Sequence, residues 1–153
     1  MKKLLLLCLL PMLCMAETKE LFWEDLVPKD YVQPEQQVDH NANSSNGQQS
    51  QHAPVVAEYN GLEVRIPGFV VPLEGDENSL TEFLLVPYFG ACIHVPPPPA
   101  NQIVHVTFAK GIKIENLYDP IWIVGTLSTQ QWSGDIATVG YSLAGTDVLP
   151  YDG

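Results

Sequence analysis

Three residues with metal-binding side chains lie close together near the middle of the chain: Cys92, His94 and His105. Cys92 and His94 are two positions apart on an expected strand, so their side chains share one face of it. If residues 96–101 connect this strand to the next as a hairpin, His105 lies opposite Cys92, with β-carbons about 4.5–5.5 Å apart. A thiolate with two imidazoles suits zinc or copper. This register therefore predicts a transition-metal site formed by the three residues.

The same residues also fit a site without metal. Cys92 lies between two apolar neighbours, and a free cysteine is among the most buried residue types. A slip of one residue in the hairpin would move His105 to the other face of the sheet. A fourth ligand is not determined, and the candidates are Asp119, Glu74 and Tyr88. The alternative is a buried cysteine with two histidines that bind only protein groups.

A run of four prolines follows these residues and predicts a shaped binding loop. Consecutive prolines form stiff polyproline II without backbone N–H donors. The loop comprises Pro96, Pro97, Pro98, Pro99 and Asn101. Proline-rich loops beside aromatic side chains are typical of docking surfaces, although such aromatics also serve as core and rim. The aromatic candidates are Tyr88, Phe89, Tyr118, Trp122 and Trp132.

The sequence predicts a protein that is not an enzyme. The P-loop, dinucleotide-binding, HExxH, CxxC and GxSxG motifs are all absent from the sequence. The acidic residues are scattered, so spacing assigns no carboxylate pair to acid–base chemistry. A cysteine-dependent reaction would need a constellation beyond Cys92 and one nearby histidine.

Length and charge limit the architecture and the partners. The chain has 153 residues, a length that suits one domain with tails. Its formal net charge is −11, from 7 basic and 18 acidic residues. Nucleic acid is excluded as an expected partner because phosphate binding needs a basic surface. The same sign argues against docking on anionic lipid.

The first sixteen residues are expected to be a secretory signal peptide. Two lysines precede a short apolar run, and Ala16 precedes the expected cleavage point. Leucines before Cys8 and Cys14 fit lipidation badly, so release into the periplasm is expected in preference to a lipid anchor. No other apolar run approaches transmembrane length. From Glu17 onward, five basic residues accompany the 18 acidic ones, so the net charge becomes −13, and Cys92 is the one remaining cysteine.

The mature chain divides into three parts. Residues 17–31 hold an apolar cluster and are expected to form an N-terminal arm. Residues 32–54 are rich in Gln, Asn and Ser, which predicts a flexible, disordered linker. Residues 55–153 are expected to form an all-β domain, a small barrel of short strands. Strands are predicted over 55–59 and 62–71, joined by a turn at Asn60-Gly61.

Three stretches resemble a known bacterial family. They are VRIPGFVVPLEG (64–75), FLLVPYFGACIHVPPPPANQIVHV (83–106) and LYDPIWIVGTL (117–127), and FWEDLVP (22–28) resembles the family's N-terminal element. The family is known as domain of unknown function 3299. The resemblance implies an OB-like β-barrel in a small exported protein. It also implies a genomic setting beside an ABC transporter and a link to zinc supply, and so supports zinc at Cys92, His94 and His105.

The expected function is that of a periplasmic accessory or binding protein of an ABC transporter system, connected with zinc or another transition metal. The alternative is a metal-free interaction module that docks a membrane-protein partner through the proline-rich loop and the aromatic residues. Stoichiometric zinc in the mature protein would separate the two hypotheses.

Overall fold

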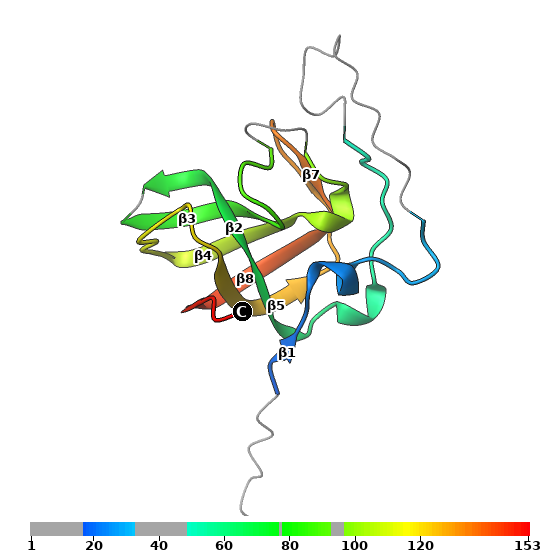
Figure 1. Ribbon diagram of the computed structural model, residues 1–153, viewed down its shortest axis with the longest axis horizontal. Coiled ribbons are helices and arrows are strands. Elements are labelled where there is room, and N and C mark those ends of the chain that lie inside the picture. The colour runs from blue at the N-terminus through cyan, green and yellow to red at the C-terminus, as the bar shows by residue number, and fades with distance from the viewer. Residues whose placement is uncertain (1–16, 33–48, 77, 93–96) are drawn as a thin grey trace, which may run out of the picture.

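The computed structural model describes residues 17–32, 49–76, 78–92 and 97–153 (Figure 1). The strands are β1 (Lys19–Glu20), β2 (Glu63–Asp76), β3 (Ser79–Val86), β4 (Val104–Ile112), β5 (Ile121–Ser128), β6 (Trp132–Ser133), β7 (Thr138–Val139) and β8 (Tyr141–Pro150). The short 3₁₀ helices are η1 (Trp23–Leu26), η3 (Ala57–Tyr59) and η4 (Ala100–Gln102). Among the described residues, none of the helices has the length and apolar character needed to cross a membrane.

Five long strands close into a barrel in the order β2-β3-β4-β8-β5, with β5 returning to β2. Neighbours are antiparallel except β4 and β8, which run parallel. Figure 1 shows the barrel with the short β1 beside β2. A five-stranded Greek-key barrel of this kind is the OB architecture. The predicted all-β, OB-like fold is confirmed.

Strand β2 closes the barrel because it serves two neighbours in succession. Its first half, residues 63–68, pairs with β5, and its second half, residues 69–76, pairs with β3. Gly68 lies where the partner changes. A β-carbon at Gly68 would lie 2.7 Å from the carbonyl oxygen of Val86 and 3.0 Å from the ring of Trp23. Only glycine lets the chain pass this closely.

The prediction of a hairpin at Asn60-Gly61 is wrong, because its first strand is absent. Residues 55–59 end in η3 instead of forming a strand, and β2 pairs with β5. Backbone bonds from Gly61 N–H to the Leu127 carbonyl (2.7 Å) and from Leu127 N–H to the Leu62 carbonyl (2.9 Å) continue that pairing. Tyr59, the last residue of η3, is buried against the inner core, and β5 takes the place of the expected local partner of β2.

The N-terminal arm packs into the barrel as expected for a docking element. Leu21 and Leu26 are fully buried and join the inner core formed by the barrel strands. The side chain of Gln102 donates to the Trp23 carbonyl (2.7 Å), where β4 is about to begin. The arm therefore covers the end of the barrel at which β4 and β8 start.

The last residues of the linker expected over residues 32–54 are ordered and belong to the domain. Residues 33–48 lie outside the described part, but residues 49–54, here called the strap, pack on the domain. The buried Gln49 amide donates to the Thr138 carbonyl (2.6 Å) and to the Pro98 carbonyl (2.9 Å), and accepts from the Thr138 N–H (2.8 Å). A polar residue can be buried when its bonding groups are satisfied, which composition alone does not reveal.

Tyr141 joins these outer segments to the barrel. Its fully buried hydroxyl donates to the Leu26 carbonyl (2.8 Å) in the arm and accepts from the Val56 N–H (2.6 Å) beyond the strap. Burial is the main reason that the pKa of Tyr141 rises from 10.0 to about 12, and the bond from Val56 opposes part of that rise.

Tyr141→Phe should lower the free energy of unfolding by about 2 kcal/mol, because two buried hydrogen bonds are lost. The neutral phenol contributes full stability below pH 10, and this contribution is lost as pH rises toward 12. The substitution should therefore also reduce the loss of stability over this pH range. Urea unfolding at pH 7, 10 and 11.5 measures both effects, with Tyr118→Phe as the exposed control. Equal curves for the two variants would contradict the role of the hydroxyl.

Candidate functional site

His105 does not face Cys92 across a hairpin. In β4, His105 pairs with Leu84 of β3 on one side and with Ser142 of β8 on the other. Both edges of the strand are occupied, so the segment that contains Cys92 cannot pair there. The predicted register is wrong because β4 is an interior strand of the closed barrel, which a local hairpin argument cannot anticipate.

The side chain of His105 lies on the outer face of the barrel but is buried. Its Nε2 lies 2.7 Å from Oε1 of Glu82, and its ring stacks on Trp132 of β6 with centroids 4.3 Å apart and planes 7° from parallel. A carboxylate on one ring nitrogen fixes the orientation of the imidazole. In the described part of the chain, the ring forms no second hydrogen bond. The Glu82 carboxylate thus positions the imidazole, and among the described residues its other ring nitrogen has no hydrogen-bond partner.

Cys92 is enclosed in a second apolar cluster, which packs on the outer face of β2, β3 and β4. Its neighbours there include Leu84, Val86 and Val139. The thiol is 6% exposed, and its burial raises the pKa of Cys92 from 9.0 to about 11. The residue also adopts a left-handed φ of 65°. The thiol is therefore protonated near neutral pH, which disfavours both metal ligation and nucleophilic attack in this conformation.

Of the other candidate ligands, Tyr88 lies near enough to Cys92 for the two groups to interact electrostatically, although burial is the main reason that the pKa of Tyr88 is raised. His94 lies outside the described residues, as does Pro96. Asp119 accepts a hydrogen bond from Asn116 (2.7 Å) on a surface loop. Within the ranges that the structure describes, no three His, Cys, Asp or Glu residues cluster closely enough to hold a metal.

The described part of the expected binding loop faces inward. Pro97 and Pro98 are buried, and the Pro98 carbonyl accepts the bond from Gln49. Asn101 is fully buried and donates to the Pro54 carbonyl (2.9 Å). These residues hold the strap in place, so this part of the loop offers little surface to a partner.

Three aromatic residues from distant parts of the chain form an exposed aromatic ridge: Phe69, Phe89 and Tyr118. The Phe89 ring lies 6.1 Å from that of Phe69 and 5.3 Å from that of Tyr118, measured between centroids. Phe89 is 51% exposed and Tyr118 is 72% exposed. A turn in which the Asn116 side chain accepts from the Tyr118 N–H (3.0 Å) presents the outermost ring. Large exposed aromatic side chains in contact are typical of binding surfaces.

Of the remaining aromatic candidates, Trp122 and Trp132 pack against the protein, whereas Tyr88 is 43% exposed on the loop after β3. Trp132 covers His105, and Trp122 is buried beneath the guanidinium of Arg65, 4.6 Å from its ring centroid. Of the five aromatics singled out in the sequence, Phe89 and Tyr118 belong to the ridge. Phe69 could not be selected from the sequence because its position in the β2 pattern fits ordinary strand packing.

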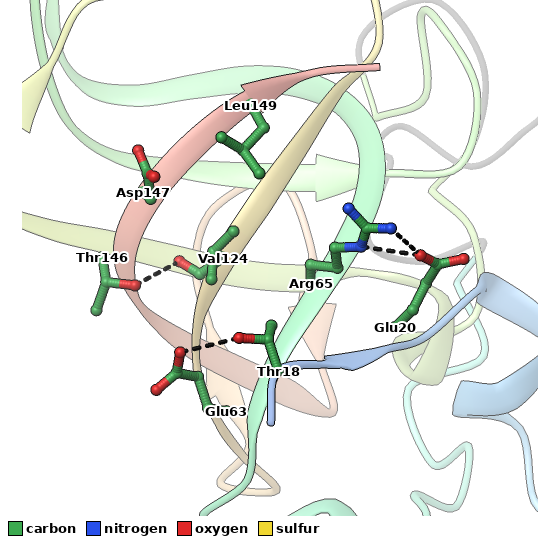
Figure 2. Close-up of a pocket in the computed structure, with 8 residues that line it drawn as sticks. All are labelled: Thr18, Glu20, Glu63, Arg65, Val124, Thr146, Asp147 and Leu149. Atoms are coloured by element: carbon green, nitrogen blue, oxygen red, sulfur yellow. Dashed lines mark hydrogen bonds and ion pairs between the residues drawn. The ribbon is translucent and has the colours of Figure 1, made fainter. Parts of the chain in front are cut away.

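A shallow cavity of about 650 Å³ lies between β1 and the outer face of β2, β5 and β8. Figure 2 shows its side chains bonded mainly to each other: Arg65 to Glu20 and Thr18 to Glu63. Thr146 donates to the Val124 carbonyl (3.3 Å) in the same view. These pairs attach the arm to the barrel, so we assign the cavity a structural role.

Residues 23–150 match the family described as "Protein of unknown function (DUF3299)". The chain belongs to the DUF3299 family. A crystal structure of a DUF3299 family protein from Pseudomonas aeruginosa PAO1 is similar to it, with 42% sequence identity and a TM-score of 0.78. The similarity covers 90% of this chain and 98% of that one. Among curated proteins, none matches. The resemblance noted in the sequence is thus confirmed, while the family's description assigns no activity.

The burial of Cys92 in this DUF3299 chain has a direct chemical consequence. At pH 8 the folded protein should react with a disulfide reagent such as DTNB at least about 100-fold more slowly than the urea-unfolded protein, because two pKa units reduce the thiolate fraction by that factor. Stopped-flow absorbance with and without urea measures the ratio of the two reaction rates. Rapid reaction of the folded thiol at pH 8 would contradict the buried assignment.

Proposed function

We propose that this DUF3299 protein is an exported, non-catalytic accessory protein that works by binding a partner protein through its aromatic ridge. The observation that carries the proposal is the contact of Phe89 with Tyr118, two rings at least half exposed on separate loops. Aromatic residues are enriched among the side chains that dominate binding energy at protein interfaces. A component of an ABC transporter system is the partner that the family resemblance favours.

The ridge is suited to binding because its position is fixed before a partner arrives. Phe69 lies on β2, which pairs with β3 at this point, and supports Phe89 edge-on at 68°. The rings therefore lose little freedom when they are covered, which lowers the entropic cost of association. The buried ends of the proline-rich loop favour this surface over that loop as the docking region.

The ridge predicts a cross-linking pattern in cells of the source organism. The photoreactive residue p-benzoylphenylalanine at position 89 or 118 should yield a discrete adduct, whereas the same residue at position 62, an exposed site just before β2, should not. Purified wild-type protein should suppress the adduct, and a Phe89→Ser, Tyr118→Ser protein should not. Equal adducts at positions 62 and 118, or suppression by both proteins, would contradict the proposal.

A second function, in transition-metal supply, is favoured by the Glu82–His105 pair. Metal-binding histidines usually donate their second ring N–H to a carboxylate, and Glu82 is placed for that bond. Zinc would be the expected ion, with Cys92, His94 and His105 as the ligands proposed from the sequence. The raised pKa of Cys92 requires that its segment rearrange before the thiolate could ligate.

This second function predicts about one zinc per chain in mature protein purified without a chelator or affinity tag. Elemental analysis measures the content, which should fall in Cys92→Ser and His105→Gln proteins and as the pH is lowered, because protons compete for the ligands. Circular dichroism must show that both variants are folded. Zinc below a tenth of an equivalent, or unchanged zinc in both folded variants, would reject the metal function and leave partner binding in place.

A further inference from the structure

An open strand edge lies beside the aromatic ridge. β4 and β8 start side by side and diverge toward their C-terminal ends (Figure 1). Their parallel pairing covers Tyr141–Ala144 of β8 alone, and in the described part of the chain the rest of β8 pairs only with β5. On this part of β8 the N–H of Val148 donates to Oδ1 of the preceding Asp147 (2.8 Å), and Val148 pairs with Ile123 of β5 on the other side. An unpaired strand edge of this kind can accept an added strand.

A groove of about 690 Å³ follows this edge. One wall is the loop between β4 and β5, and the other is the end of β8. Its lining residues are Lys113, Ile114, Glu115, Asn116, Asp119, Pro120, Ile121, Val148, Leu149, Pro150 and Tyr151. Apolar side chains from both walls thus face the groove, together with two carboxylates.

Aromatic rings stand on both sides of the groove. Tyr118 of the aromatic ridge projects from the loop that forms one wall, between the lining residues Asn116 and Asp119. On the other side, the exposed ring of Tyr151 lies 5.6 Å from the ring of Trp122. The loop between β4 and β5 thus contributes both to the wall of the groove and, through Tyr118, to the ridge. A segment in the groove would reach aromatic faces at either side.

The charges at the groove indicate the chemistry of its occupant. Glu115 and Asp119 are exposed, and the exposed Lys113, which follows β4, also lines the groove, so the charged lining residues sum to −1. The mature chain as a whole carries −13, so a cationic segment is attracted and an acidic one is repelled. The protein already places Lys19 over Tyr59 and Arg65 over Trp122, each 4.6 Å from the ring centroid. Rings on this protein thus accept cationic side chains from its own sequence.

We infer that the groove takes an extended, basic segment of the partner protein, which adds as a strand to the open edge of β8. Its backbone pairs with the edge, its basic side chains face Glu115 and Asp119, and its alternate apolar side chains face Ile114 and Val148. This inference rests on the proposed partner-binding function. It specifies the partner's chemistry and the way in which the segment is held.

Synthetic peptides test each part of this inference on the full mature protein. The probe is a fluorescein-labelled twelve-residue peptide of alternating Arg and Leu, measured by fluorescence anisotropy. Three comparison peptides are a Glu-Leu version, a Ser-Leu version, and an Arg-Leu version with N-methyl groups at alternate residues. The last keeps the side chains and removes backbone donors.

The Arg-Leu peptide should bind, with affinity that falls as salt rises from 0.05 to 0.5 M, because salt screens exposed charges. The Glu-Leu and N-methylated peptides should bind at least about tenfold more weakly. Glu115→Gln with Asp119→Asn should weaken binding about three- to tenfold. Asparagine at position 119 keeps an acceptor for Asn116, so the loop retains its bond.

A second groove provides the matched control. The cavity of about 470 Å³ beside the arm is lined by Glu24 and Glu58, with Lys29 nearby, and carries none of the ridge aromatics. Glu24→Gln with Glu58→Gln removes the same net charge and should leave binding unchanged. Equal weakening by the two double variants would show that only net charge acts and would overturn the inference.

Other outcomes separate this inference from the partner-binding proposal. If Ser-Leu and Arg-Leu peptides bind equally and Tyr118→Ser weakens both, the basic character is refuted while the ridge remains a binding surface. Full binding of the N-methylated peptide refutes strand addition. No binding of any peptide at 1 mM overturns the inference, and the cross-linking pattern at positions 89 and 118 then decides the partner-binding proposal by itself.

Discussion

The hydroxyl of Tyr141 connects two segments that lie outside the barrel strands, the N-terminal arm and the chain at Val56, to the start of β8. It is fully buried at the start of β8, and it donates to the arm at Leu26 while it accepts from the chain at Val56. A buried hydroxyl is costly without partners, so its two bonds and the two segments that supply them are mutually dependent. The arm is therefore integral to the domain, and Leu21 and Leu26 fill part of its inner core.

One part of the outer surface of the barrel is covered by the protein's own segments, and another part is exposed. On the face of β2, β3 and β4, the β6–β7 hairpin and the segment around Cys92 cover a second apolar cluster. Trp132 stacks on His105 there, and Gln49 anchors β7 from the strap. This face is where many OB folds take ligands, but here the protein's own segments occupy it. The exposed aromatic side chains lie instead on the loops after β3 and β4, where no such cover is present among the described residues.

The barrel topology itself creates the second binding feature. β4 and β8 are the one parallel pair among the five barrel strands, and their pairing is limited to four residues of each strand. β4 leaves β8 after four paired residues, and the loop that leads from β4 to β5 crosses the opening. That loop carries Tyr118 together with Glu115 and Asp119. The separation of β4 from β8 thus leaves an open edge on β8. The loop between β4 and β5 supplies the acidic side chains that favour a basic segment at this edge.

Local pattern determined much of the fold. The apolar pattern predicted a strand over 62–71, and β2 covers Glu63–Asp76, because strand periodicity depends on burial of one face and needs no knowledge of the partner. The apolar cluster around Leu21 and Leu26 likewise indicated a docked arm. By contrast, the polar composition around Gln49 predicted a linker, since composition does not record which polar groups find partners in a buried position.

The sequence by itself determined the all-β class, the family and a set of candidate binding residues. Tertiary structure decided which of those residues contact one another. Cys92 and His105 appear adjacent only if neighbouring strands pair, and closure of the barrel gives His105 the neighbours Leu84 and Ser142 instead. Phe69 and Tyr118 are 49 positions apart in the chain, yet Phe89 contacts both. Contacts of this kind depend on strand order and register over the whole barrel, which are properties of the closed sheet and are not encoded in any single segment.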